Sequence, residues 1–180
     1  MDNINNYRTV LSPKLPLVKQ WINTTLSQHS ASVQGILNFN FPKVNDCFSP
    51  EIIKITKVVI VDKVPVPPLS QLGLGQLDGF ESGDYAGITF IDTYFLSAKY
   101  SSLEALHFHE LVHIVQWQHL GVDRFLLIYG MGLLQFGYFN SPLEVMAYEY
   151  QKKFEQNLFT RGIEDDIKTK IDALAGALAI

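Results

Sequence analysis

The stretch Leu106–Trp117, LHFHELVHIVQW, decides how the rest of this sequence is interpreted. It holds His109, Glu110 and His113 in the spacing H-E-x-x-H, inside an otherwise apolar run. On a helix, residues four positions apart lie one turn above each other, so both imidazoles can be directed at one point. Two histidines placed in this way bind one zinc ion, and the glutamate takes the proton from the water that the ion activates. The spacing therefore predicts a zinc-dependent hydrolase.

A catalytic zinc site needs a third protein ligand beside the two histidines. No further histidine follows at the short spacing H-E-x-x-H-x-x-G-x-x-H, so we expect a carboxylate from a later helix. The segment SPLEVMAYEYQ offers Glu144 and Glu149, which point about 140° apart on a helix. We favour Glu144, because the small Ala147 lies one turn later and lets two helices pack closely. Glu149, which has bulky neighbours, stays open as the second choice.

Helix-start signals precede both segments. Capping-box patterns are formed by Ser101 with Glu104 and by Ser141 with Glu144, and Gly121 predicts the end of the motif helix. Glu144 thus has two roles open to it, as a metal ligand or as a capping residue.

The remaining sequence predicts a single α+β domain, mostly helical with a small mixed sheet. We divide it into an N-terminal helical part (1–56), a small sheet with a long loop (57–100), the active-site and third-ligand helices (101–160) and a C-terminal helix (164–180). The expected elements are a helix over 17–26, a helical segment over 33–39, strands over 57–62 and 86–95, a loop over 63–85, a buried apolar segment over 125–139, and helices over 141–159 and 164–179.

Composition excludes several classes of protein. The net charge is −4 and no cluster of Lys or Arg occurs, so a nucleic-acid partner is not expected. Cys47 is the only cysteine, which excludes an internal disulfide and a cysteine-based zinc site. The opening MDNINNYRTV lacks the pattern of a signal peptide, and the longest apolar stretch is shorter than the roughly 20 residues that cross a bilayer. We therefore expect a cytoplasmic protein without a transmembrane segment.

The pattern HFHELVHIVQW…LG…F…Y…SPLEVMAY resembles the gluzincin branch of zinc metallopeptidases, in particular the compact minigluzincins. The resemblance covers roughly residues 88–151, about a third of the chain. It implies a zincin-like fold similar to a reduced thermolysin-like catalytic core. It also implies one zinc ion held by His109, His113 and Glu144, with Glu110 as the general base. The strand over 86–95 would bind an extended peptide at the sheet edge.

Several other polar residues are candidates for supporting roles. A donor to the developing oxyanion is expected in such an enzyme, and the phenols considered are Tyr138, Tyr148 and Tyr129. We rank Tyr138 first, because a loop can present its side chain over a site, and Tyr148 second. Residues that could orient the ligand imidazoles are Asp92, Asp123 and Gln116. His107 and His119 point away from the face that His109 and His113 share.

The functional expectation is a zinc peptidase that hydrolyses peptide bonds of a peptide or protein substrate. The main alternative is a catalytically silent domain in which the metal only ties two helices together. Glu110 argues against that alternative, since a structural site needs no base. A metal-dependent hydrolase of a non-peptide amide is the third possibility. Natural substrate and oligomeric state are not specified by these residues.

Overall fold

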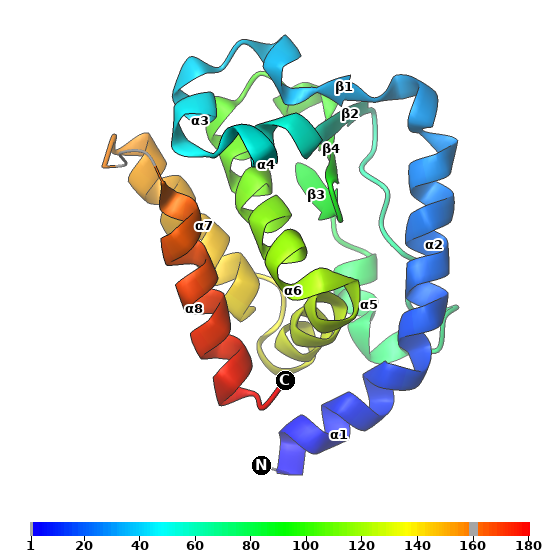
Figure 1. The fold of residues 1–180 in the computed structure, drawn as a ribbon. Coiled ribbons are helices and arrows are strands. Elements are labelled where there is room, and N and C mark those ends of the chain that lie inside the picture. The colour runs from blue at the N-terminus through cyan, green and yellow to red at the C-terminus, as the bar shows by residue number, and fades with distance from the viewer. Residues whose placement is uncertain (1, 159–161) are drawn as a thin grey trace.

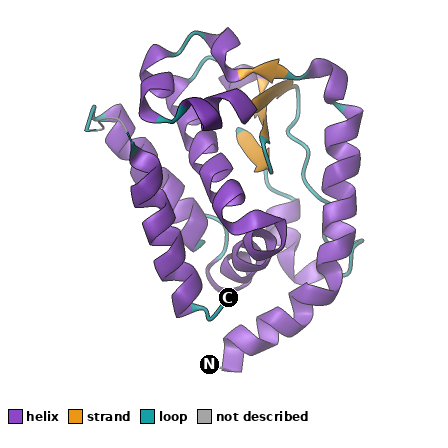
Figure 2. Ribbon diagram, viewed as in Figure 1, coloured by secondary structure: helices purple, strands orange, loops and turns teal. Residues whose placement is uncertain are grey.

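The computed structural model describes residues 2–158 and 162–180. Helix α6 (Glu104–Phe136) runs through the centre of the molecule. Helices α7 (Pro142–Glu155) and α8 (Ile163–Ala177) lie on one side of it, and α2 (Leu15–Gln28) lies on the other (Figure 1). About 66% of the chain is helical, which agrees with the predicted α+β class (Figure 2).

A small mixed sheet lies beside the first half of α6. Its strands are β1 (Gln34–Gly35), β2 (Lys57–Val61), β3 (Gly87–Phe90) and β4 (Thr93–Ser97), in the spatial order β1-β2-β4-β3. Strands β2 and β4 are parallel, and the other two pairs are antiparallel. Strand β3 therefore forms one edge of the sheet and packs against α6.

Shorter helices complete the fold. Helix α1 (Asp2–Leu11) packs against the second half of α6. The connections contain α3 (Pro42–Cys47), α4 (Pro50–Ile55) and α5 (Asp78–Glu81). Helix α5 belongs to the long proline- and glycine-rich segment over 63–85, which otherwise lacks regular structure apart from one 3-10 turn among its described residues.

The single strand predicted over 86–95 is a β-hairpin, so that prediction was wrong. Phe90 pairs with Thr93, which leaves a two-residue turn at Ile91 and Asp92. Ile91 has a φ of 64°, in the left-handed region that a β-branched residue rarely adopts. Two-residue hairpin turns usually carry Gly or Asn at such a position, so the sequence held no turn signal here.

The motif helix differs from its prediction at its start but agrees with it at Gly121. It begins at Glu104 with Leu103 as N-cap, and the Ser101 hydroxyl instead donates to the Ala98 carbonyl. Gly121 interrupts the helix with φ 71° and ψ 166°, but the chain resumes helical structure at once and continues to Phe136. The first part of α6 therefore ends at Gly121 as predicted, and α6 consists of two helices joined across a kink.

The other predicted elements agree with the structure to within a few residues, but several features differ. The individual helices α1, α3, α4 and α5 were not predicted, and residues 33–39 form β1 and a 3-10 turn over Ile36–Phe39. The segment predicted to be buried over 125–139 is exposed at residues 135–137 and at Phe139. Helix α7 ends at Glu155, and the predicted end at residue 159 lies outside the described residues. No helix among the described residues is both long and apolar enough to cross a membrane.

Close packing at the end of α6 depends on Gly132. A Cβ atom at this position would overlap the Ser141 hydroxyl at the start of α7 and approach the Pro142 ring to 3.0 Å. The glycine thus lets the two helices meet at the connection that precedes Glu144. Gly176 in α8 provides a comparison, because a Cβ atom there would meet no described atom within 4 Å.

We expect Gly132→Ala to lower the free energy of unfolding by about 1–3 kcal/mol, because the added methyl group overpacks the junction. Gly176→Ala serves as the matched control and should raise stability by up to about 1 kcal/mol through helix propensity. Chemical denaturation of both variants measures these changes. Equal effects of the two substitutions would contradict the assigned contact.

Candidate metal centre

Three buried side chains from two helices converge on one point. His109 and His113 come from successive turns of α6, and Glu144 is the third residue of α7. Their side chains are only 3–6% exposed. The two Nε2 atoms are 3.1 Å apart, and Glu144 places Oε2 3.5 Å from His109 Nε2 and Oε1 3.4 Å from His113 Nε2.

These separations suit a common ion. Three ligand atoms held tetrahedrally at about 2.0–2.2 Å from one zinc ion lie about 3.3–3.6 Å from each other. The three closest contacts among His109, His113 and Glu144 fall at or near this range. Glu144 Oε2 also has no hydrogen-bond partner among the described residues, although it is buried. A group of two imidazoles and one carboxylate in this arrangement could hold a metal ion.

The structure separates the two roles that were open to Glu144. Ser141 is the N-cap of α7, but its backbone N–H donates to the Tyr138 carbonyl at 3.1 Å. Glu144 makes no reciprocal capping bond and turns inward to the two histidines. Glu149 lies on the exposed face of α7 and is not part of the group.

Burial and proximity set the charges of the group. Burial by itself would raise the pKa of Glu144, but the imidazoles of His113 and His109 outweigh it and hold that pKa well below its usual range. Burial likewise disfavours the charged form of His113, yet the Glu144 carboxylate raises the pKa of this imidazole to about 9. Without a metal, the group is therefore a buried ion pair between the carboxylate and a protonated His113.

Neighbouring side chains orient the ligands. The Gln116 side chain places Oε1 2.8 Å from His113 Nδ1, and its Nε2 donates to the Leu143 carbonyl on α7. The Tyr129 hydroxyl donates to Glu144 Oε1 at 2.7 Å. Of the three orienting residues considered from the sequence, Gln116 is the one that contacts a ligand. Asp92 and Asp123 instead pair with lysines elsewhere.

Glu110 is buried beside the histidines and held by strand β3. The Thr89 hydroxyl donates to its Oε2 at 2.6 Å. Burial raises the pKa of Glu110, while His109, His113 and the Thr89 hydrogen bond reduce the rise. Gly87 makes room for the carboxylate, because a Cβ atom at this position would overlap Glu110 Oε1. The sequence did not single out Thr89, since it lies 21 residues away from Glu110 and no short-range pattern links them.

The candidate tyrosines lie around the group in different ways. Tyr129 is already engaged with Glu144. Tyr138 lines the same cavity as Glu110 and Glu144, and the Tyr148 ring lies 4.6 Å from the His109 ring. Burial, with Glu144 as a further cause, raises the pKa of Tyr138 and of Tyr148. Both phenols therefore stay protonated at neutral pH and can donate a hydrogen bond.

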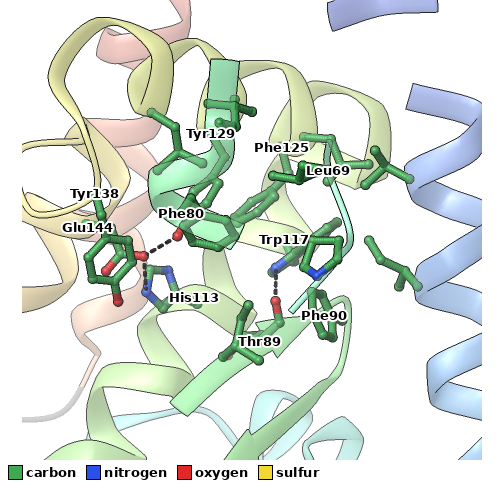
Figure 3. A pocket seen from close by; sticks show the side chains of 18 of the residues that line it. Leu69, Phe80, Thr89, Phe90, His113, Trp117, Phe125, Tyr129, Tyr138 and Glu144 are labelled. Carbon is green, nitrogen blue, oxygen red and sulfur yellow. Dashed lines mark hydrogen bonds and ion pairs between the residues drawn. The ribbon is translucent and has the colours of Figure 1, made fainter. Parts of the chain in front are cut away.

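The edge strand beside the group retains free backbone groups. In an antiparallel pair, alternate residues of a strand form hydrogen bonds to the partner strand, and the residues between them direct their N–H and C=O groups outward. Ser97 N–H donates to the Ala86 carbonyl, so Ala86 faces β4. Gly87 and Thr89 therefore direct their backbone groups to the open edge. The Trp117 indole N–H donates to the Thr89 carbonyl at 3.1 Å (Figure 3). One outward carbonyl is thus occupied, and within the described part of the chain no strand pairs with the edge beside Gly87.

The other two histidines near the motif have separate partners. His107 lies between the Tyr94 hydroxyl and the Ser101 carbonyl, at 2.7 and 2.8 Å. His119 pairs with Asp172 of α8 at 2.7 Å. Both point away from the metal-binding group, as their helical spacing predicts.

Comparison of the chain with protein-family models, curated proteins and solved structures found no match.

Removal of the third ligand is expected to abolish tight metal binding. Glu144→Ala leaves two imidazoles and should lower zinc affinity by at least about 100-fold, since it removes one of three ligands. Glu149→Ala on the exposed face of the same helix is the matched control and should leave zinc affinity unchanged. Competition with a fluorescent chelator measures both, and the reverse order would identify Glu149 as the ligand.

The buried ion pair predicts a pH dependence for the metal-free protein. The pKa of His113 rises from 6.5 to about 9 on folding, so its stabilising effect is complete below pH 6.5 and is lost as the pH rises towards 9. We expect the free energy of unfolding to fall by about 2–3 kcal/mol over this window. Urea denaturation in the presence of a chelator measures it. The variant Glu144→Gln, which removes the partner charge, should show a much smaller decline.

Proposed function

We propose that this chain is a zinc-dependent peptidase, with a metal ion held by His109, His113 and Glu144 and with Glu110 as the general base. The observation that carries the proposal is the position of Glu110, which lines one cavity together with His113 and Glu144. A metal centre that only joins two helices has no need of a buried carboxylate beside it. The resemblance of the motif region to gluzincins supports the same assignment.

When bound, a zinc ion supplies a Lewis acid that polarises a carbonyl and makes water more acidic. Glu110 then accepts a proton from the attacking water, whose oxygen forms a bond to the carbonyl carbon. The same carboxylic acid returns the proton to the leaving nitrogen as the C–N bond breaks. Its raised pKa makes Glu110 a better base, and the Thr89 hydrogen bond fixes the carboxylate.

The remaining groups would bind and orient the substrate. Tyr138, ahead of Tyr148, would donate a hydrogen bond to the developing oxyanion, because its phenol lines the cavity beside Glu110. The open edge of β3 at Gly87 would pair with the backbone of an extended peptide. This strand and the Glu110 carboxylate are in contact through Thr89, so a peptide paired at the edge passes directly by the base.

The proposal is tested by metal analysis and peptide cleavage with Glu110→Gln beside the wild type. Both proteins should carry one zinc per chain, because Glu110 is not a ligand. Wild type should cleave members of a broad peptide library, and the variant should be at least about 100-fold slower. Zinc in both proteins with cleavage by neither would favour the silent metal-binding domain. Absence of stoichiometric zinc from wild type would refute the metal centre itself.

A further inference from the structure

An apolar cavity of about 80 Å³ extends from the metal-binding group towards the N-terminal helices. Figure 3 shows Glu144, His113 and Tyr138 at one end, and Trp117, Phe90 and Leu69 towards the other. The cavity passes His113 and follows the later turns of α6. It therefore lies on the C-terminal side of the H-E-x-x-H motif.

The far wall comes from parts of the chain outside the motif region. It is lined by five aliphatic side chains, each at most 6% exposed: Leu11 of α1, Val18 and Ile22 of α2, and Leu69 and Leu74 of the 63–85 segment. The polar groups nearest this wall already have partners. The Trp117 indole N–H is bonded to the Thr89 carbonyl, and the Tyr129 hydroxyl is bonded to Glu144. A group that enters the far end therefore meets hydrocarbon.

The size of the cavity limits what it can hold. An engineered apolar cavity of about 150 Å³ binds benzene, whereas this one has about half that volume. A branched aliphatic group of three or four carbons fits better than an aromatic ring. A dry apolar void destabilises the folded state unless it is filled, and concave apolar spaces with a few convergent polar groups are the usual form of ligand sites.

We propose that this cavity is a specificity pocket that takes a compact branched aliphatic group of the substrate, next to the bond that is cleaved. The inference rests on the proposed peptidase function and assigns the N-terminal helices and the 63–85 segment to substrate selection. The side chain of valine, leucine or isoleucine has the required size. The polar end of the cavity then faces the scissile bond, and the apolar end buries the side chain.

Binding of acyl hydroxamates to the zinc-loaded protein tests the pocket, since the head group binds zinc and the acyl chain varies. Acetyl, 2-methylpropanoyl, 3-methylbutanoyl, 4-methylpentanoyl and phenylacetyl hydroxamates form the series. The best branched member should bind roughly 10- to 50-fold more tightly than the acetyl compound, because burial of each methylene group contributes several-fold in affinity. The phenylacetyl compound should bind more weakly than that member. Equal affinities for all members of the series would overturn the inference.

Matched variants identify the pocket wall. Ile22→Ala enlarges the cavity and should move the preference to the phenylacetyl or longest chain, a gain that simple loss of stability cannot produce. Ile171→Ala removes the same atoms from an equally buried position in α8 that does not line the cavity. It should leave the order of affinities unchanged. The same shift in both variants would overturn the assignment of the wall to α2.

Xenon binding to the metal-free protein separates this inference from the proposed function. Xenon enters small apolar cavities without a metal, so its NMR shift should respond to wild type and change in Ile22→Ala but not in Ile171→Ala. A xenon response together with no zinc binding would refute the peptidase proposal, and with it the role in substrate selection. Zinc binding and peptide cleavage without any xenon or chain-length response would refute the pocket alone.

Discussion

The burial of the Glu144 carboxylate is the constraint on which the rest of the site depends. An isolated carboxylate in a protein interior costs several kcal/mol in lost hydration, so it requires a cation in contact. Glu144 is 2% exposed, and the groups that meet it are His109, His113 and the Tyr129 hydroxyl. Either a proton on His113 or a metal ion can supply the positive charge. The carboxylate thus requires a positive charge at the junction of α6 and α7, and the group there could bind a metal ion.

This requirement also explains the contacts between the two helices. Gln116 joins a ligand imidazole on α6 to the Leu143 carbonyl on α7, next to Glu144. Tyr129, from the second half of α6, contacts the same carboxylate from another side. The same side chains therefore hold the two helices together and orient the ligands. Gln116 and Tyr129 could not be assigned these roles from the sequence, because glutamine and tyrosine also occur at many positions that do not contact a metal ligand.

Local patterns predicted much of the fold and the core of the site. The H-E-x-x-H spacing brought together His109 and His113 correctly, because helical geometry alone fixes their relation. The choice of Glu144 over Glu149 agrees with the group that the structure brings together. Features that depend on distant residues were missed. Thr89 lies beside Glu110 because the hairpin places it there. The sequence did not indicate that hairpin, because its turn carries Ile91 with a positive φ instead of Gly or Asn.

Gly121 limits which changes in chain length α6 can accept. Its left-handed conformation divides α6 into a half that supplies the histidines and a half that supplies Tyr129 and the later cavity wall. One backbone torsion thus sets the rotation of the two halves about each other. A side chain at this position would strain the bend, because a φ of 71° favours glycine. An insertion or deletion between the halves would turn Tyr129 away from Glu144, since each added residue rotates a helix by about 100°. The number of residues between His113 and Tyr129 is therefore part of the geometry that holds Glu144, because both side chains contact its carboxylate.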